Sequence, residues 1–358
     1  MRTIFLSFTI AESSVSDYFS ELSNRLAAEF QVIIITDGKK VRPEGISSKI
    51  KIFKWPSKRP TNWSDLRFLI QMVKRYRPEI MLSVFGSVNM FLIVGFLLGV
   101  KTRIAWSRTI SAQFASKKSL QMRKKYVYKL ATHIFANSKA TKLDLVQNFG
   151  VPEIKIEVVY NAVKQPLDRT NNIIKNKIVY VGRMHPSKGV LTLLQAMPLV
   201  ISKFPDVNLV LVGGELEGKE IKDLKAKAEV LEIGKSISFL GNRPKICVLE
   251  EFSEAYCTVV PSLVEAFGFV VIESFSVKTP VVGSNTSGIA EIVRDGKDGF
   301  LFEPGNSEDL AFNLIKLLGN PELRKNFSEG CYQRFLEEFE IKKSTQKLVL
   351  KISDLASV

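Results

Sequence analysis

One stretch of the chain reads Cys257-Thr258-Val259-Val260-Pro261-Ser262-Leu263-Val264-Glu265-Ala266-Phe267-Gly268-Phe269-Val270-Val271-Ile272-Glu273. Its first four residues form a short apolar run that is typical of a buried strand. A loop follows, and Gly268 lies where a helix can begin. The first turn of such a helix presents free backbone N–H groups and the positive end of its dipole to an anion. The stretch therefore predicts a strand, a loop and a helix whose N-terminus can bind an anion.

Two carboxylates frame this predicted helix start. Glu265 precedes the helix and Glu273 lies within it, so a continuous helix would separate them by about 12 Å along its axis. That separation is too large for an acid/base pair, but it suits one extended ligand with hydroxyl groups at both ends. The alternative is a solvated Glu265 and a Glu273 that only complements the helix dipole.

A second loop of interest lies about eighty residues upstream and reads Tyr180-Val181-Gly182-Arg183-Met184-His185-Pro186-Ser187-Lys188-Gly189. It follows an apolar run and precedes a helical pattern. Gly182 permits close approach of a ligand to the backbone, while Arg183 and Lys188 provide two cations. This arrangement suits a diphosphate. The alternative is a basic surface loop in which Gly189 only marks the start of the helix.

Short β-branched and aromatic runs alternate with amphipathic stretches along the chain, as in parallel sheets built from βαβ units. In the first half we expect strands at Thr3–Phe8, Gln31–Thr36, Ile50–Trp55, Ile80–Val84, Thr102–Trp106, His133–Asn137 and Ile156–Tyr160. In the second half we expect them at Lys177–Val181, Val207–Val212, Ser236–Leu240, Cys257–Val260, Pro280–Gly283 and Gly299–Phe302. The chain after Ser307 is mainly helical in pattern.

A polar stretch from Lys164 to Asn176 separates the two series of strands, and we place a domain junction there. The sequence predicts an α/β protein with two doubly wound, Rossmann-like domains that face each other across a cleft. We expect a first domain at 1–165, a linker at 166–176, a second domain at 177–335 and a helical tail at 336–358. The tail could pack back on the first domain. Such folds bind ligands at the carboxyl ends of their strands.

The segment from Ile80 to Val100 has no charged residue and is about long enough to span a bilayer. However, Gly86, Ser87 and Asn89 interrupt it, and its first residues have a strand pattern. We therefore favour a buried strand, a turn and a core helix over a transmembrane helix.

Composition places the chain among globular proteins of ordinary type, with 358 residues, 46% hydrophobic and 24% charged. The formal net charge of +15 predicts an anionic partner, such as a phosphate compound, acidic lipid or nucleic acid. Cys247, Cys257 and Cys331 lack metal-ligand spacing and are expected to be reduced core residues. The N-terminal residues do not have a signal-peptide pattern, so we expect a cytoplasmic protein.

Five motifs follow one another along the second half of the chain in a recognisable order. Gly182-Arg183 with Lys188-Gly189 is followed by the Pro261–Glu273 segment, then Thr279-Pro280-Val281-Val282, Ser287-Gly288-Ile289-Ala290-Glu291-Ile292-Val293 and Asp298-Gly299-Phe300-Leu301. From Lys177 to Leu318 the chain resembles the donor domain of retaining glycosyltransferases of family 4, also called group 1. Upstream, Phe135-Ala136-Asn137-Ser138 and residues 155–163 resemble the end of the family's N-terminal domain more loosely. The resemblance implies the GT-B architecture.

The resemblance also implies roles for individual residues. Arg183 and Lys188 would neutralise the donor diphosphate, Glu273 would bind the ribose, and Glu265 with the Gly268 backbone would hold the sugar. The expected catalytic residues are thus Glu265, Arg183 and Lys188, and the expected donor-binding residues are Gly182, Arg183, Lys188, Glu265, Phe267, Gly268, Phe269 and Glu273. The family needs no metal, so cations and helix N-termini would meet the charge on the departing nucleotide. The nucleoside-diphosphate sugar is then a co-substrate, and no cofactor is expected.

The implied activity is transfer, with retention, of a sugar from a UDP- or GDP-sugar to a cell-envelope, lipid-linked or polysaccharide acceptor. A second reading is a catalytically weak GT-B protein that acts as a partner or scaffold subunit. A phosphorylase or a sugar-nucleotide epimerase is compatible with the fold alone. Nucleic-acid binding is not expected, because no recognition module is visible.

The first domain departs from the family pattern. The family's glycine-rich turn after the first strand is absent from Thr9–Val15, and its usual Asn-Gly-Val is Asn161-Ala162-Val163 here. Many members also have a cleft histidine, which neither His133 nor His185 matches in position. The residues Arg103, Ser107 and Arg108 could line the cleft instead, or could lie on the surface.

The segment from Lys117 to Ala131, taken as a helix, is basic and amphipathic. Its basic arc contains Lys117, Lys118, Lys124, Lys125 and Lys129, and its apolar side contains Leu120, Met122, Tyr126, Val127, Leu130 and Ala131. We expect this basic face to rest on anionic lipid at the inner face of the membrane. The alternative is an ordinary surface helix whose apolar side packs on the sheet.

Overall fold

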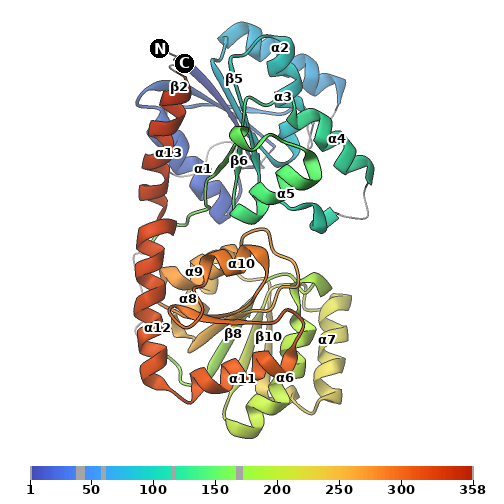
Figure 1. Ribbon diagram of the computed structural model, residues 1–358, viewed down its shortest axis with the longest axis vertical. Coiled ribbons are helices and arrows are strands. Elements are labelled where there is room, and N and C mark those ends of the chain that lie inside the picture. The colour runs from blue at the N-terminus through green and yellow to red at the C-terminus, as the bar shows by residue number, and fades with distance from the viewer. Residues whose placement is uncertain (1, 38–44, 58–61, 115–117, 167–171, 357–358) are drawn as a thin grey trace. The chain divides into compact units, whose positions relative to one another are not determined.

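The computed structural model describes residues 2–37, 45–57, 62–114, 118–166 and 172–356. The chain forms two compact units, which are numbered here in chain order (Figure 1). Unit 1 contains residues 1–164 and 341–358, and unit 2 contains residues 165–340. The segment expected as a linker therefore belongs to unit 2 in its described residues, and the expected tail divides between the two units at Ile341.

Unit 1 is built on parallel strands in the order β3-β2-β1-β4-β5-β6-β7, seven of them among the described residues. The strands are β1 (Arg2–Ser7), β2 (Phe30–Thr36), β3 (Lys51–Lys54), β4 (Ile80–Val84), β5 (Thr102–Ser107), β6 (His133–Ala136) and β7 (Ile156–Val158). The α-helices are α1 (Ser14–Leu26), α2 (Trp63–Tyr76), α3 (Val88–Leu97), α4 (Lys118–Tyr128), α5 (Lys139–Phe149) and α13 (Ile341–Leu355). Short 3-10 turns are η1 (Phe85–Ser87), η2 (Ser111–Phe114) and η3 (Glu153–Lys155).

Both faces of the unit 1 sheet are buried. On one face, Leu6, Ile34 and Ile104 pack with Leu22 of α1 and Ile352 of α13. On the other, strand residues that include Phe5, Ile33 and Met81 pack with Leu69 of α2 and Phe91 of α3. Helices α1 and α13 lie side by side, blue and red in Figure 1, and contact each other although they come from opposite ends of the chain.

The uncharged segment from Ile80 to Val100 forms β4, the η1 turn and α3. The strand is wholly buried in the middle of the sheet, which explains its lack of charge and confirms the expected strand and turn. The helix α3 is buried on one side only, with Phe96 and Leu97 exposed. Within the described parts of the chain, none of the helices is long and apolar enough to cross a membrane.

Unit 2 has a parallel sheet in the order β10-β9-β8-β11-β12-β13, with six strands in the portion of the chain that is described. The strands are β8 (Lys177–Val181), β9 (Asn208–Val212), β10 (Ile237–Gly241), β11 (Cys257–Val260), β12 (Val281–Ser284) and β13 (Gly299–Phe302). The α-helices are α6 (Val190–Lys203), α7 (Lys219–Val230), α8 (Lys245–Glu254), α9 (Phe269–Ser276), α10 (Ser287–Ile292), α11 (Ser307–Leu318) and α12 (Pro321–Arg334). Shorter turns are η4 (Pro186–Lys188), η5 (Gly234–Ser236) and the π-helical η6 (Phe335–Phe339).

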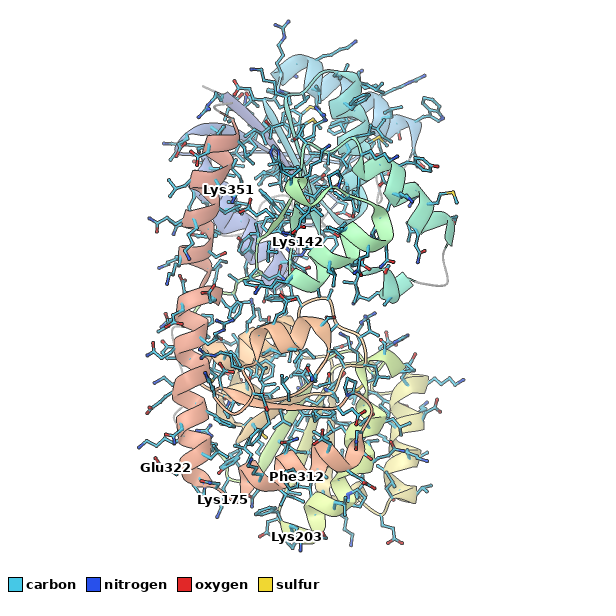
Figure 2. All side chains as sticks on the ribbon, viewed as in Figure 1. Lys142, Lys175, Lys203, Phe312, Glu322 and Lys351 are labelled. Carbon is cyan, nitrogen blue, oxygen red and sulfur yellow. The ribbon has the colours of Figure 1, made fainter. Side chains whose placement is uncertain are left out.

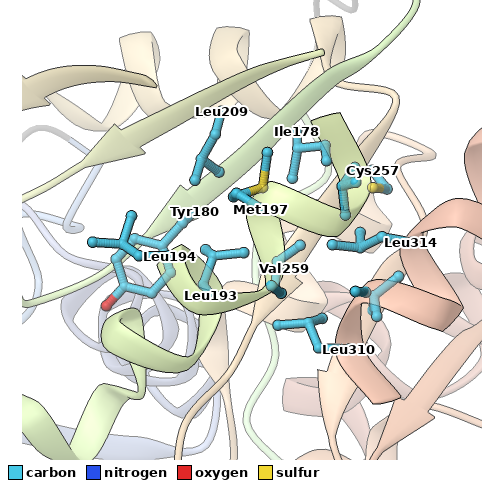
Figure 3. Close-up of a cluster of buried hydrophobic side chains, with 14 of the residues drawn as sticks. Ile178, Tyr180, Leu193, Leu194, Met197, Leu209, Cys257, Val259, Leu310 and Leu314 are labelled. Atoms are coloured by element: carbon cyan, nitrogen blue, oxygen red, sulfur yellow. The ribbon is translucent and has the colours of Figure 1, made fainter. Parts of the chain in front are cut away.

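The main core of unit 2 lies between its sheet and helices α6 and α11 (Figure 3). Leu193 and Met197 of α6 pack with Ile178 of β8 and Val259 of β11, and Leu314 of α11 joins the same cluster. Cys257 is fully buried there and Cys331 is buried on α12, whereas Cys247 is only half-buried. Burial of this kind raises the pKa of the Cys257 thiol to about 12, so the group is unreactive at neutral pH.

Side-chain caps fix where several helices begin. Ser13 accepts a hydrogen bond from the backbone of Ser16 at the start of α1, and Ser138 accepts one from Thr141 at the start of α5. Asn320 caps α12, and Pro321 occupies its first position, where a missing N–H has no consequence. The Ser138 cap starts α5 soon after β6, at the carboxyl edge of the unit 1 sheet, whereas the Asn320 cap separates α12 from α11.

Surface lysines project from both units, for example Lys142, Lys203 and Lys351 (Figure 2). Lys142 forms an ion pair with Glu153 at 2.8 Å, and Lys351 pairs with Glu157. Each of these ion pairs uses one cation and one carboxylate, so the net positive excess belongs to other side chains.

Helix α4 differs from the expected basic amphipathic helix. It ends at Tyr128, and Met122 and Tyr126, which were expected on the apolar side of the helix, are 62% and 63% exposed. Lys124 was expected on the basic face that rests on anionic lipid but is half-buried, and its Nζ lies 3.3 Å from the hydroxyl oxygen of Thr109. Burial lowers the pKa of Lys124 to about 8. The helical wheel failed because the contact with the loop after β5 rotates the buried face toward Lys124, Val127 and Tyr128.

Candidate active site

The two loops with candidate site residues follow neighbouring strands of unit 2. β8 pairs with β11 in parallel, with Ile178 opposite Cys257, so the loops leave the sheet at the same edge. They touch directly: the backbone N–H of Leu263 donates to the carbonyl of Ser187 at 2.9 Å. Gly189 has φ of +67°, and a Cβ there would lie 1.9 Å from the Pro261 carbonyl oxygen. Only glycine allows this contact, which explains the residue at position 189.

The loops bring Lys188 and Glu265 together. The Lys188 Nζ lies 2.5 Å from Oε2 of Glu265, although 77 residues separate the two in sequence. Their side chains are only 18% and 15% exposed, so the pair is stronger than a surface ion pair. The hydroxyl of Ser262 lies 3.5 Å from the same carboxylate oxygen. Sequence reasoning assigned Lys188 and Glu265 to different parts of a donor, and the structure places them in one hydrogen-bonded group.

Tyr180 supports the turn that contains Gly182 and Arg183. Its buried hydroxyl donates to the Arg183 carbonyl at 2.7 Å, and a Cβ on Gly182 would lie 2.7 Å from the same hydroxyl oxygen. Burial, and then the negative charge of Glu265, raise the pKa of Tyr180. Arg183 itself is exposed above this support. Tyr180 thus supports the turn from the interior of the protein, while the Arg183 side chain faces solvent.

Helix α9 begins as the sequence predicts. Gly268 is its N-cap with φ of +107°, and the helix runs from Phe269 to Ser276. Glu273 is half-buried on this helix, and Phe269 is half-buried at its start. Phe267 is fully buried, with its ring edge-on to those of Phe269 and Phe339 at 6.0 Å each. The Phe267 side chain therefore belongs to the core, and only its backbone is left for a ligand.

A third motif fixes the backbone of Glu265. The N–H of Gly288 and the hydroxyl of Ser287 both donate to the Glu265 carbonyl, at 3.2 and 3.3 Å. A Cβ on Gly288 would lie 2.5 Å from the backbone nitrogen of Phe267, so α10 packs against this loop at backbone distance. Five candidate residues, namely Gly182, Arg183, Lys188, Glu265 and Gly268, consequently lie on loops that are mutually braced.

The structure also shows a pocket that sequence reasoning missed. It has a volume of about 350 Å³ and lies beside the Arg183–Lys188 loop, lined by Met184, His185, Pro186, Val190, Leu191, Glu220, Asp223, Leu224 and Lys227. Its walls come from η4, α6 and α7. No local sequence motif predicts how these elements pack together. His185 is tied to the loop through Nδ1, which accepts from the Ser187 backbone at 3.2 Å.

In unit 1, Arg103 does not line the carboxyl edge of the sheet. It lies at the start of β5, where Nε donates to the Leu130 carbonyl at 2.8 Å and Nη1 to that of Val100. This arginine therefore joins α3, β5 and α4 at the opposite edge, and its proposed site role is wrong. Ser107 and Arg108 do lie at the carboxyl end of β5, and both are buried.

Arg108 is enclosed by aromatic rings. Its guanidinium carbon lies 5.7 Å from the ring centres of Phe19 and Phe85 and 5.8 Å from that of Trp106. Burial lowers the pKa of Arg108 to about 10, so the group still stays charged at neutral pH. Burial, and then Lys155, lower the pKa of His133, which lies at the start of β6 away from this edge.

The chain matches known families over nearly its whole length. Residues 165–334 match Glycosyl transferases group 1, and residues 15–165 match Glycosyltransferase Family 4. An uncharacterized glycosyltransferase of Haemophilus influenzae is 28% identical over 316 residues, covering 86% of this chain and 87% of that protein. An uncharacterized glycosyltransferase of Methanocaldococcus jannaschii is 31% identical over 263 residues, covering 72% and 70%.

Solved structures show the same architecture. Anabaena HepE in complex with UDP superposes with a TM-score of 0.81 at 18% identity, covering 99% of this chain and all of that one. Two parallel sheets flanked by helices, with such a neighbour, define an α/β protein of the GT-B fold. The chain belongs to the group 1 glycosyltransferases, also named glycosyltransferase family 4.

Proposed function

We propose that the protein transfers a sugar, with retention of configuration, from a UDP- or GDP-sugar to a cell-envelope, lipid-linked or polysaccharide acceptor. The observation that supports this most is the contact between Lys188 and Glu265 beside the start of α9. It joins a cation, a carboxylate and a helix N-terminus within one braced edge of a sheet. These are the groups that a diphosphate attached to a hydroxyl-rich sugar requires.

The proposed roles follow from this geometry. Arg183, Lys188 and the first N–H groups of α9 neutralise the diphosphate and the charge that develops on it as the glycosidic bond breaks. Glu273 accepts hydrogen bonds from the ribose, and Glu265 accepts them from the sugar. Since Lys188 is already paired with Glu265, a bound diphosphate takes over part of this ion pair. The carboxylate is then released toward the sugar hydroxyls.

This proposal assigns the charge neutralisation to the protein alone, with the nucleotide sugar as co-substrate and without a metal or cofactor. The test is a thermal-shift series with UDP, GDP and ADP and with their sugars, in buffer containing a chelator. A ligand that binds only the folded protein raises its melting temperature by mass action. We expect one nucleoside diphosphate and its sugar to stabilise the protein. We also expect the protein to hydrolyse that nucleotide sugar slowly. Stabilisation without any turnover would favour the scaffold reading, and no stabilisation would contradict the donor site.

We also propose that unit 1 rests on the inner face of an anionic membrane through α3 and α4. Met122 and Tyr126 are exposed on α4 between the cations Arg123, Lys125 and Lys129. Phe96 and Leu97 are exposed on α3, which contacts α4, and Arg103 joins the two helices. Exposed apolar side chains enter the lipid boundary while cations meet anionic headgroups. This surface replaces the all-lysine face that the sequence indicated.

A further inference from the structure

We propose that unit 1 contains a binding site for an anionic oxygen group, a phosphate ester or a carboxylate, built on Arg108 and Trp106 and covered by Phe85. The site deepens the proposed function, because the anion would belong to the acceptor. Its location at the carboxyl ends of β4 and β5 is where sheets of this type bind ligands.

The first observation is a buried cation. Arg108 is 8% exposed, and it follows directly after the last residue of β5. Three aromatic rings surround its guanidinium, and the hydroxyl of the neighbouring Tyr18 lies 3.1 Å from that of Ser344 on α13. Aromatic faces attract the flat side of a guanidinium, whereas its N–H groups recognise carboxylates and phosphates within their own plane. The enclosure therefore holds a charged guanidinium among aromatic rings, and an oxygen anion is the ligand that such a cation recognises.

The second observation is independent of the arginine. Trp106 is fully buried, and among the residues that the structure describes nothing accepts a hydrogen bond from its Nε1. An indole N–H can only donate, and a buried donor without an acceptor is costly. The side-chain Nδ2 and Oδ1 of Asn161 are also buried without a hydrogen-bond partner among the described residues. The adjoining Ala162 packs in the cluster that contains Trp106 and Tyr18. The Trp106 ring lies 5.8 Å from the Arg108 guanidinium, so a buried donor without an acceptor lies beside a buried cation, and an oxygen anion is the ligand that accepts from such a donor.

The third observation concerns access. Phe85, the first residue after β4, has φ of +54°, which is a strained conformation for a bulky side chain. Its ring is 51% exposed and lies 5.7 Å from the Arg108 guanidinium. Next to it, a Cβ on Gly86 would have open space within 4 Å. The strained residue therefore forms the solvent side of the enclosure, and its movement is the route to the arginine.

Indole NMR gives a direct test on the wild-type protein, because all three tryptophans lie in unit 1. The probe is glucose 1-phosphate, and its neutral counterpart is methyl α-glucopyranoside, both added with UDP present to occupy the donor site. We expect the Trp106 Nε1–H resonance, assigned with Trp106→Phe, to shift with the phosphate ester only. Trp55, whose Nε1 donates to Ser7, and the exposed Trp63 serve as internal controls and should not shift. A Trp106 resonance that stays constant at saturation overturns the proposal.

Variants then test the arginine. Arg108→Met keeps much of the volume among the rings and should weaken glucose 1-phosphate binding at least about tenfold, whereas Arg108→Lys should retain part of it. The matched control is Arg67→Met, which removes one exposed charge from α2. Equal affinities in Arg108→Met and Arg67→Met would contradict the site. If Arg108→Met does not fold, the Nε–H resonance of Arg108 in the wild type replaces it and must shift with the phosphate.

Two further arms separate the sources of the anion and the two proposals. If vesicles with phosphatidic acid shift the Trp106 Nε1–H resonance and phosphatidylcholine vesicles do not, the anion is a lipid phosphate. If only the soluble ester shifts this resonance, the anion is a sugar phosphate. A Trp106 shift in a protein that no nucleoside diphosphate stabilises supports the anion site while contradicting the glycosyltransfer proposal.

Discussion

Lys188 and Glu265 give the candidate site its character at the scale of single residues. Each is mostly shielded from water, and each is the partner of the other. A charge in such a place has a cost that its partner offsets, so removing one member leaves the other in an unfavourable state. Substitutions here therefore change both the donor interaction and the local electrostatics, and the predictions must separate the two.

Lys188→Ala and Glu273→Ala should each weaken donor binding or turnover at least about tenfold, because each removes a charge-assisted hydrogen bond of ~1.5 to 3 kcal/mol. Isothermal titration with the best nucleotide and initial rates with its sugar measure the effect. Circular dichroism should show both variants folded. Lys203→Ala, at an exposed position of α6, is the control. Wild-type kinetics in both site variants would mean that the donor binds elsewhere.

Glu265→Gln should reduce sugar transfer while leaving the affinity for the free nucleoside diphosphate unchanged or higher. The carboxylate competes with the diphosphate for Lys188 at 2.5 Å, and the amide competes less. Titration of UDP or GDP into the variant, beside the rate of transfer, makes the comparison. A loss of diphosphate affinity equal to the loss of transfer would remove Glu265 from its sugar-binding role.

At the scale of elements, helix α4 shows how an expected surface changes once neighbours are present. A helical wheel drawn from the sequence alone predicts the buried side of the helix from its apolar residues. In the structure, the loop after β5 decides which side of α4 is covered. Asp144 of α5 holds that loop by accepting from the Ser111 backbone at 2.9 Å, and Lys124 turns toward the same region. The exposed side consequently contains Met122 and Tyr126.

Met122→Glu combined with Tyr126→Glu should release the protein from anionic liposomes, because both changes place charges in the proposed apolar contact. Co-sedimentation with phosphatidylglycerol vesicles at low salt measures binding, which should weaken as salt rises. Leu350→Glu, on the exposed side of α13, is the matched control and should still bind. Binding of the double variant at the wild-type level would dismiss α4 as the contact.

Most strands were predictable because they fill buried positions in a parallel sheet and therefore have near-continuous apolar runs, as Ile80–Val84 illustrates, although the edge strand β3 is only partly buried. The start of α9 was predictable because Gly268 has a backbone conformation that few other residues adopt. The ion pair of Lys188 with Glu265 was not, since it depends on the contact of Gly189 with Pro261 between two loops. The aromatic enclosure of Arg108 likewise joins α1, η1 and β5, which no local pattern connects.

At the scale of the whole molecule, unit 1 depends on a helix from the far end of the chain. Ile341, Leu348 and Ile352 of α13 are buried against the same core as α1, and the N–H of Ile341 donates to the Val163 carbonyl at 3.1 Å. The last helix is thus part of the unit formed by the first residues.

Ile352→Ala should lower the free energy of unfolding of unit 1 by about 2 to 5 kcal/mol, as expected for truncation of a fully buried side chain. All three tryptophans lie in unit 1, so their fluorescence in a urea titration follows that unit selectively. Leu350→Ala, two residues away and exposed, should change it by much less. Similar effects of the two changes would show that α13 does not contribute to this core.

The position of α13 has a consequence for synthesis on the ribosome. Unit 2 is one uninterrupted stretch, residues 165–340, whereas unit 1 needs residues 341–358 as well. The part of the chain that is translated first is therefore the part that finishes folding last. At elongation rates of about 5 to 20 residues per second, unit 1 waits on the order of ten seconds or more after its strands are made, with the surface that receives α13 uncovered. During that interval the nascent chain offers an apolar face to chaperones, and this face is covered once residues 341–358 have left the ribosome.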